Sequence, residues 1–206
     1  MIPKWLKWAK ELQSLSQSGL NYTENPFEIE RYKAIMKISA EIMAEYSSVE
    51  TEKIIDLFSR QAGHATPRVD VRGVIFKDGK ILLVKERLDG KWTLPGGWAD
   101  PNETPSHAVE REVFEESGFI VNAEKLLALY DRDKQGHKPP HPFHVYKIFF
   151  LCEITGGKKT LSNETDDIAF FSEKEIPELS EARTTIRQLR HFFKMYNASN
   201  WYTDFD

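Results

Sequence analysis

The stretch that decides the fold covers residues 94–119 and reads LPGGWADPNETPSHAVEREVFEESGF. Thr104 is a favourable helix N-cap, Pro105 suits the first helical position, and Gly118 suits the position just past a helix end. The sequence therefore predicts a helix over residues 105–117, preceded by a loop that contains two adjacent glycines.

Three acidic side chains of this helix, Glu112, Glu115 and Glu116, fall within an arc of roughly 100° on one face. Carboxylates packed in this way repel one another at neutral pH unless a cation lies among them. Their hard oxygen atoms suit Mg²⁺ or Mn²⁺ rather than zinc. Arg111 stands four residues before Glu115 and can pair with it. We therefore predict a divalent-cation site, which in turn would hold an anionic substrate.

The loop before the helix belongs to the same predicted site. Gly96 and Gly97 permit a close backbone approach, from which we expect a carbonyl group to point at the metal. Glu103 lies just ahead of the helix and can join the carboxylates. Residues 97–119 hold six acidic side chains and one basic side chain. A run of charge is usually a solvated face, but the flanking glycines and the spacing favour a metal site.

The spacing of these residues resembles the signature of the Nudix hydrolases. The matching positions, in order, are Gly97, Glu103, Arg111, Glu112, Val113, Glu115, Glu116, Gly118 and Phe119. Phe119 departs from the aliphatic residue usual there, which affects no catalytic position. The resemblance implies an α/β/α sandwich around a mixed sheet over residues 67–206. It also implies an enzyme that hydrolyses a nucleoside diphosphate linked to another moiety, with bound Mg²⁺ or Mn²⁺.

By the same resemblance, Glu112, Glu115 and Glu116 hold metal together with the carbonyl of Gly97, and Arg111 and Glu103 support them. Many members take the general base from an acidic loop, which here is residues 162–167. Glu164 is the expected base. The alternatives left open are Asp166, Asp167, a glutamate of the signature, and the loop histidines His137, His141 and His144.

Further residues are candidates for substrate contact. Arg68, Arg87 and Lys134 can neutralise phosphate oxygens, and Trp98 lies inside the signature loop. The histidine-rich run 137–144 contains no cysteine, so we interpret it as a substrate or interface loop rather than a zinc site.

Residues 1–66 have helical periodicity in three segments. The first covers about residues 4–18. The second opens with the cap Asn25 before Pro26, and the third opens with a predicted capping box from Ser47 to Glu50 and stops near Gly63. About 60 residues form a marginal core alone. We therefore expect a small all-helical N-terminal domain that packs on the rest of the chain or on a second copy, giving a homodimer.

Residues 67–206 alternate between strand and helix patterns, which predicts a mixed α/β domain. Expected strands cover residues 68–77, 81–86, 126–131, 144–154 and 168–171, and a closing helix covers about 180–196. Asp78-Gly79 is a hairpin signal between the first two strands.

The whole chain is similar to the CDP-choline pyrophosphatase branch of the family, on the helical segment followed by PRVDVRG at 67–73 and LPGGWAD at 94–100. That similarity implies release of CMP and phosphocholine. Aromatic faces bind quaternary ammonium groups, and the candidate walls are Trp98, Tyr130, Trp201 and Tyr202. The alternatives are an ADP-ribose or ADP-sugar pyrophosphatase, an RNA-end-processing enzyme and a ligand-sensing protein.

Composition limits the partners and the compartment. The formal net charge is −4, which argues against DNA binding and makes RNA binding an unfavoured alternative. The longest apolar run is about five residues, far below the roughly 20 that span a bilayer. A single cysteine, Cys152, indicates a core residue in a reducing compartment. Charges interrupt the apolar pattern at the N-terminus, so we expect no signal peptide and a cytoplasmic protein.

Overall fold

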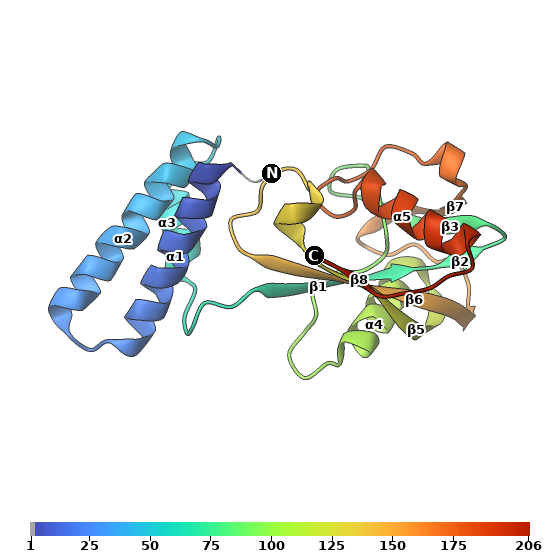
Figure 1. The fold of residues 1–206 in the computed structure, drawn as a ribbon, viewed down its shortest axis with the longest axis horizontal. Coiled ribbons are helices and arrows are strands. Elements are labelled where there is room, and N and C mark those ends of the chain that lie inside the picture. Colours follow the sequence, from blue (N-terminus) through green and yellow to red (C-terminus); the bar gives the residue numbers. More distant parts are fainter. Residues whose placement is uncertain (1–2) are drawn as a thin grey trace. The chain divides into compact units, whose positions relative to one another are not determined.

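The computed structural model describes residues 3–206 and divides them into two compact units. The helical unit consists of residues 3–67 together with residues 141–144. The second unit consists of residues 68–140 and 145–206. Figure 1 shows the elements of each unit.

The helical unit contains α1 (Lys4–Tyr22), α2 (Pro26–Glu45) and α3 (Thr51–Ser59). Leu6 and Met36 are buried where α1 meets α2, and Phe58 of α3 packs edge-on against Phe143, with ring centroids 6.0 Å apart. The contact with Phe143 ties the 141–144 segment to this unit. Although α1 and α2 are 19 and 20 residues long, no helix in the described part of the chain is apolar enough to cross a membrane.

Of the two predicted helix caps in this unit, one is confirmed and the other is wrong. Asn25 accepts a hydrogen bond from the backbone N–H of Phe27, which confirms the cap before α2. The predicted capping box from Ser47 to Glu50 is wrong. The Ser47 hydroxyl accepts instead from the nearby N–H of Val49, and Glu50 precedes α3 without a side-chain cap. A serine that bonds locally forms a turn of its own and does not extend the helix.

The second unit holds two four-stranded sheets. One sheet has the order β1-β6-β5-β8, with β1 parallel to β6 and β5 antiparallel to β6. In the other, β3 pairs with β2, β4 and β7. The bounds are β1 (Arg68–Val74), β2 (Phe76–Lys77), β3 (Lys80–Glu86), β4 (Trp92–Thr93), β5 (Phe119–Asp131), β6 (Val145–Gly157), β7 (Thr165–Phe171) and β8 (Asp204–Phe205). The helices are α4 (Pro105–Ser117) and α5 (Ile186–Asn197), with short 3-10 turns η1 (Arg132–Gln135) and η2 (Glu173–Glu175).

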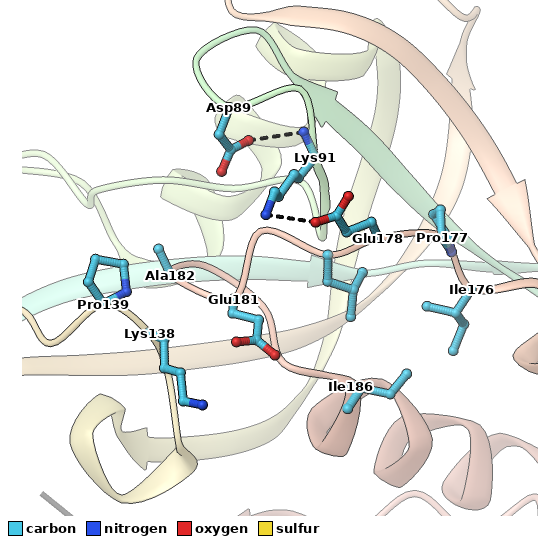
Figure 2. Close-up of a pocket in the computed structure, with 11 residues that line it drawn as sticks. Asp89, Lys91, Lys138, Pro139, Ile176, Pro177, Glu178, Glu181, Ala182 and Ile186 are labelled. Carbon is cyan, nitrogen blue, oxygen red and sulfur yellow. Dashed lines mark hydrogen bonds and ion pairs between the residues drawn. The ribbon is translucent and has the colours of Figure 1, made fainter.

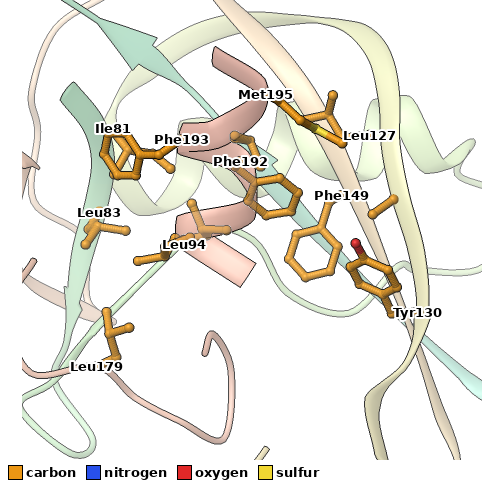
Figure 3. Close-up of a cluster of buried hydrophobic side chains, with 13 residues drawn as sticks. Ile81, Leu83, Leu94, Leu127, Tyr130, Phe149, Leu179, Phe192, Phe193 and Met195 are labelled. Carbon is orange, nitrogen blue, oxygen red and sulfur yellow. The ribbon is translucent and has the colours of Figure 1, made fainter. Parts of the chain in front are cut away.

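Helices α4 and α5 cover opposite sides of the strands (Figure 1), which confirms the predicted sandwich with a mixed sheet. On the α5 side, Phe192 packs on Phe149 with ring centroids 5.2 Å apart (Figure 3). On the α4 side, Val109 and Val113 are fully buried in the cluster that also contains Cys152. The burial of Val109 and Val113 positions α4, and with it the glutamates.

Several element boundaries differ from the prediction. The expected strand 68–77 is two strands with different partners, because β1 pairs with β6 and β2 pairs with β3. Strand β5 begins seven residues early, and its three register shifts against β6 break the alternation that identifies a strand. The closing helix begins at Ile186, where Thr185 and Gln188 form a capping box. The hairpin is confirmed, since Asp78 and Gly79 both have positive φ.

Candidate active site

Helix α4 begins and ends where its sequence predicts. The Thr104 hydroxyl accepts from the N–H of His107 at 3.3 Å, with Pro105 at the first position. Gly118 adopts a left-handed conformation with φ of 74° and donates to the carbonyl of Phe114. The orientation of the four glutamates on this helix is therefore set by local chemistry.

The loop ahead of α4 runs along β1. The N–H of Val71 donates to the carbonyl of Gly97 at 2.8 Å, and the N–H of Gly73 donates to Pro95 at 2.8 Å. The carbonyl of Gly97 thus accepts a backbone hydrogen bond from β1, which leaves its second lone pair for another partner. A Cβ at Gly96, where φ is 139°, would overlap the backbone carbonyl of Val71 and lie 2.8 Å from Cα of Arg72, so the close approach of loop and β1 requires glycine at position 96. A Cβ at Gly97 would meet only the end of the Glu112 side chain, at 2.6 Å from Oε2.

Arg111 lies at the centre of an acidic cluster formed by Glu103, Glu112 and Glu115. Its Nε and Nη2 donate to both oxygens of Glu103 at 2.7 and 2.9 Å, and its Nη1 donates to Glu112 at 2.9 Å and Glu115 at 3.0 Å. Nη2 also reaches the carbonyl of Trp98 at 3.4 Å. The predicted pairing with Glu115 is present, and it is one part of a larger arrangement that orients three carboxylates at once.

Protonation equilibria in this cluster follow from the hydrogen bonds and from burial. Hydrogen bonds from Arg111 lower the pKa of Glu103, and the bond to Glu103 is the main cause that raises the pKa of Arg111. Burial raises the pKa of Glu112, although Arg111 opposes that shift. Arg111 therefore favours the charged form of Glu103 and limits the upward pKa shift that burial imposes on Glu112.

Glu116 has a different environment from the other glutamates. It is 5% exposed, and its Oε2 accepts from the N–H of Gly96 at 2.8 Å. Burial raises the pKa of Glu116 to about 8, although Arg72 and the bond from Gly96 oppose the shift. Its charge is therefore costly unless a cation approaches.

The three signature glutamates do not converge on one point in this structure. Within residues 3–206, no three histidine, cysteine, aspartate or glutamate side chains are placed to share a metal ion. The carboxylates of Glu112 and Glu115 accept hydrogen bonds from Arg111, and the carboxylate of Glu116 accepts one from the N–H of Gly96. The chemistry of the donors nevertheless fits a hard dication. They are carboxylate oxygens, and the most buried one has a raised pKa that a neighbouring cation would lower.

A buried charged network adjoins Glu116. Arg72 of β1 donates through Nε and Nη2 to both oxygens of Asp70, each at 2.9 Å, and Lys147 of β6 donates to Asp70 at 2.5 Å. The third Arg72 nitrogen donates to the carbonyl of Leu94 at 3.0 Å. Sequence analysis missed these residues. The available signal was a pair of opposite charges two residues apart, hence on one face, in an otherwise apolar strand.

The charges of this network depend on one another. Burial alone would raise the pKa of Asp70, but Arg72 and Lys147 outweigh burial and hold that pKa well below its usual range. Burial lowers the pKa of Lys147 to about 7 against the attraction of Asp70. Arg72 remains a fixed cation whose field reaches Glu116 and Glu86.

The acidic loop 162–167 is tied to the end of α4. The hydroxyl of Thr165 donates to the carbonyl of Glu116 at 3.0 Å. Asp166 pairs with Arg87 at 2.9 Å, and Asp167 pairs with Lys159 at 2.7 Å. The carboxylate of Glu164 has no ion pair among the described residues, so it is the loop carboxylate left to accept a proton.

The loop histidines belong to different compact units. His137 is buried, its Nδ1 donates to the carbonyl of Glu181 at 2.9 Å, and its Nε2 lies 3.1 Å from the side-chain amide of Gln188. Burial lowers the pKa of His137 to about 3, so the ring is neutral and both nitrogens are engaged. His141 and His144 belong to the segment grouped with the helical unit. We therefore withdraw His137 as a candidate base.

The predicted substrate contacts fall in different places. Trp98 is 45% exposed, and its carbonyl accepts a hydrogen bond from Arg111. The backbone N–H of Arg87 donates to the carbonyl of Glu164. Arg68 begins β1, and Lys134 lies in η1.

The predicted aromatic wall residues differ in burial and in their neighbours. Tyr130 is 5% exposed in the core and donates to Asp204, and Trp201 packs on Phe76. Tyr202 lies beside His191. Tyr130 is thus a core residue, contrary to the expectation that it binds a ligand.

Comparison with known proteins identifies the class. The NUDIX domain model matches residues 66–192, and a model described as "UDP-X-like, N-terminal oligomerisation domain" matches residues 3–58. "Putative ADP-ribose pyrophosphatase YjhB" of Bacillus subtilis strain 168 is 41% identical over 203 residues, which cover 98% of this chain and 97% of that protein.

Two solved structures agree. An ADP-ribose pyrophosphatase from Streptococcus suis 89-1591 is 37% identical, with a TM-score of 0.61 over 68% of this chain and all of the other. A UDP-X diphosphatase is 29% identical, with a TM-score of 0.63 over 97% of this chain and 98% of the other. The chain therefore belongs to the Nudix family and is a pyrophosphohydrolase of nucleoside diphosphate-linked compounds, as its signature predicts.

The environment of Glu116 predicts an unusual pH dependence of stability. Between its ordinary pKa of 4.5 and its folded pKa of about 8, the unfolded chain releases a proton that the folded protein retains, so stability falls as pH rises. Glu116→Gln removes this cost and keeps an oxygen for the N–H of Gly96. At pH 8 in EDTA we expect the variant to melt about 5 °C above wild type, or about 1–2 kcal/mol, and the difference to vanish near pH 5.

Thermal melts by circular dichroism across this pH range measure the effect. The matched control is Glu115→Gln, because Glu115 is half exposed and pairs with Arg111. Parallel pH profiles for wild type and Glu116→Gln would contradict the buried, protonated state of Glu116.

Proposed function

We propose that this protein hydrolyses the diphosphate bond of ADP-ribose and related nucleoside diphosphate sugars. The observation that carries the proposal is the relative named as an ADP-ribose pyrophosphatase, which is 41% identical over almost the full length of both chains. The structural match to a UDP-X diphosphatase, also over the whole chain, widens the class to other bases and sugars. The products from ADP-ribose are AMP and ribose 5-phosphate.

Nudix hydrolases use divalent cations, and Mg²⁺ or Mn²⁺ is the proposed cofactor here. Glu112, Glu115 and Glu116 are the residues that would hold it, while the carbonyl of Gly97 would have to serve with its second lone pair. A bound dication neutralises charge on the diphosphate and acidifies a bound water. Arg111 supports the donors, because it orients Glu112 and Glu115 by direct hydrogen bonds.

Glu164 is the proposed general base. Its carboxylate oxygens would accept the proton of the attacking water, which requires a carboxylate that is not neutralised by a neighbouring cation. Asp166 and Asp167 each have such a cation, in Arg87 and Lys159. The hydrogen bond from Thr165 to the carbonyl of Glu116 supports this role, because it anchors the residue next to Glu164 to the signature helix.

CDP-choline becomes the less favoured substrate. No relative or solved structure compared above bears that name, and Tyr130, one of the aromatic residues expected to surround the choline, lies in the core. An exposed aromatic, Trp98, remains in the signature loop. CDP-choline therefore belongs in the substrate panel as a competitor of ADP-ribose.

A homodimer formed by the helical unit is the proposed assembly. The matching family model is described as an oligomerisation domain. Trp8 and Leu15 of α1 are 57% and 58% exposed and lie seven residues apart, hence on one face of the helix. Large apolar side chains grouped on a surface are typical of an interface. The cytoplasm remains the proposed location, on the single, buried free cysteine.

The substrate proposal is tested with one panel. Purified protein with Mg²⁺ or Mn²⁺ is incubated with ADP-ribose, ADP-glucose, UDP-glucose, CDP-choline and a 5′-triphosphate RNA oligomer, and products are identified by mass spectrometry. We expect ADP-ribose to give AMP with the highest kcat/KM, and Glu116→Gln to lower it by about 10²-fold or more. The exposed Glu153→Gln is the control and should keep full activity. Release of CMP as the fastest reaction, or no turnover of any compound, would contradict the proposal.

The base assignment is tested by a matched pair of variants. We expect Glu164→Gln to lower kcat by about 10²–10³-fold with little change in KM, and to remove the acidic limb of the pH–rate profile. Asp166→Asn changes a neighbour that is already paired with Arg87, so most activity should remain. Retention of the acidic limb by Glu164→Gln would show that another group accepts the proton.

The assembly is tested by light scattering with size-exclusion chromatography. We expect wild type to elute as a dimer and the double variant Trp8→Glu, Leu15→Glu to elute as a monomer with unchanged helix content. Leu88→Glu is the control, since Leu88 is 83% exposed in a turn of the second unit. A monomeric wild type, or a dimeric double variant, would place the interface elsewhere.

A further inference from the structure

The second unit contains a cavity of about 640 Å³ that the catalytic proposal does not use. It lies among the turn at 89–91, the loop at 138–139, the segments 176–179 and 181–182, and Ile186 at the start of α5 (Figure 2). A cavity of this volume is in the range that holds a small molecule.

Buried polar side chains donate hydrogen bonds to backbone carbonyls of the segments that line the cavity. Arg132, which is 5% exposed, donates through Nη2 to the carbonyls of Pro139 at 2.9 Å and Ala182 at 3.3 Å. Buried His137 donates to the carbonyl of Glu181 at 2.9 Å. The loop at 138–139 is therefore clamped to the segment at 181–182, and the cavity has a preformed shape.

Most of the charged groups that line the cavity are already satisfied. Lys91 pairs with Glu178 at 2.8 Å, and Asp89 accepts from the hydroxyl of Ser180 at 2.7 Å and from the N–H of Lys91 at 3.0 Å. In Figure 2 these groups lie above the Glu181 carboxylate and the Lys138 ammonium. Within residues 3–206, neither of those two side chains has a hydrogen bond or an ion pair.

The charge and the apolar surface of the lining residues indicate which kind of ligand the cavity would bind. Three carboxylates against two ammonium groups make the cavity net negative, which disfavours a phosphate. Ile176, Leu179 and Ile186 offer apolar surface to a flat or uncharged group. A free carboxylate with two oxygens suits two neighbouring hydroxyls, as when an acidic residue binds ribose. The lining therefore matches a ribose and its base.

The cavity is connected to the signature glutamates through Arg183. Arg183 pairs through Nε with Glu86 at 3.0 Å and approaches the cavity residue Asp89 through Nη1 at 3.6 Å. Glu86 of β3 lies opposite Thr165 of β7, and the hydroxyl of Thr165 donates to the carbonyl of Glu116 at 3.0 Å. One arginine side chain thus spans from the edge of the cavity to the carboxylates around the proposed reaction centre.

We propose that this cavity binds the nucleoside of the substrate, with Glu181 accepting hydrogen bonds from the 2′- and 3′-hydroxyls of the ribose that bears the base. The assignment rests on the proposed function, since it places the diphosphate towards Glu86 and Glu116. Lys138, on the rim, donates to an acceptor on the base. Selectivity for ribonucleotides then resides in Glu181.

The test compares ADP-ribose with its analogue that lacks the 2′-hydroxyl of the adenosine ribose. We expect wild type to have a KM about tenfold lower for ADP-ribose, and Glu181→Gln to raise that KM about tenfold while the KM for the analogue and both kcat values stay within about twofold. The matched control is Glu173→Gln, an exposed glutamate of η2 outside the cavity. A second variant, Ile186→Trp, fills the cavity and should raise both KM values. An unchanged ribose preference in Glu181→Gln, or an Ile186→Trp enzyme with wild-type KM values, would overturn the assignment.

Calorimetry separates this inference from the proposed function. Adenosine and 2′-deoxyadenosine are titrated into wild type, Glu181→Gln and Glu173→Gln, which requires no turnover. Tighter binding of adenosine that is lost only in Glu181→Gln supports the cavity even if ADP-ribose is not hydrolysed. Equal affinities of wild type and Glu181→Gln for adenosine would overturn it even if hydrolysis occurs.

Discussion

The guanidinium of Arg111 is the interaction on which the rest of the site depends. It binds both oxygens of Glu103 and reaches Glu112 and Glu115, so one cation orients three carboxylates that would otherwise repel one another. The loop ahead of the helix lies against β1, and glycine is required at position 96 because a Cβ there would overlap the backbone of Val71. The charge of Arg111 and the missing side chain of Gly96 together make an acidic helix compatible with a packed fold.

Burial divides the signature carboxylates into two kinds. Glu103, Glu112 and Glu115 are paired with Arg111, whereas the pKa of Glu116 is raised to about 8 because burial outweighs the opposing effects of Arg72 and the N–H of Gly96. Arg72 supplies a fixed positive charge that opposes this shift, and Asp70, which also binds Lys147, holds Arg72 in place. A dication that reaches Glu116 would therefore gain from a carboxylate whose charge is otherwise unfavourable.

Local features were predictable and long-range ones were not. The caps of α4 and the hairpin at Asp78 follow from residue types that satisfy backbone groups within a few positions. The start of β5 was missed because register shifts against β6 break its alternation. Tyr130 and His137 were taken for ligand-binding candidates, since an aromatic or imidazole side chain has the same letter whether it is buried or exposed.

The sequence by itself determined the class of chemistry, because the signature glutamates lie within one helix, where a spacing of three or four residues dictates the face. Only the tertiary structure decided which groups are available. It engaged the carbonyl of Gly97 with β1, paired Asp166 with Arg87, and left the side-chain carboxylates of Glu164 and Glu181 without a hydrogen bond or ion pair among the described residues. The physical reason is that availability depends on contacts between segments far apart in the chain, which no local spacing encodes.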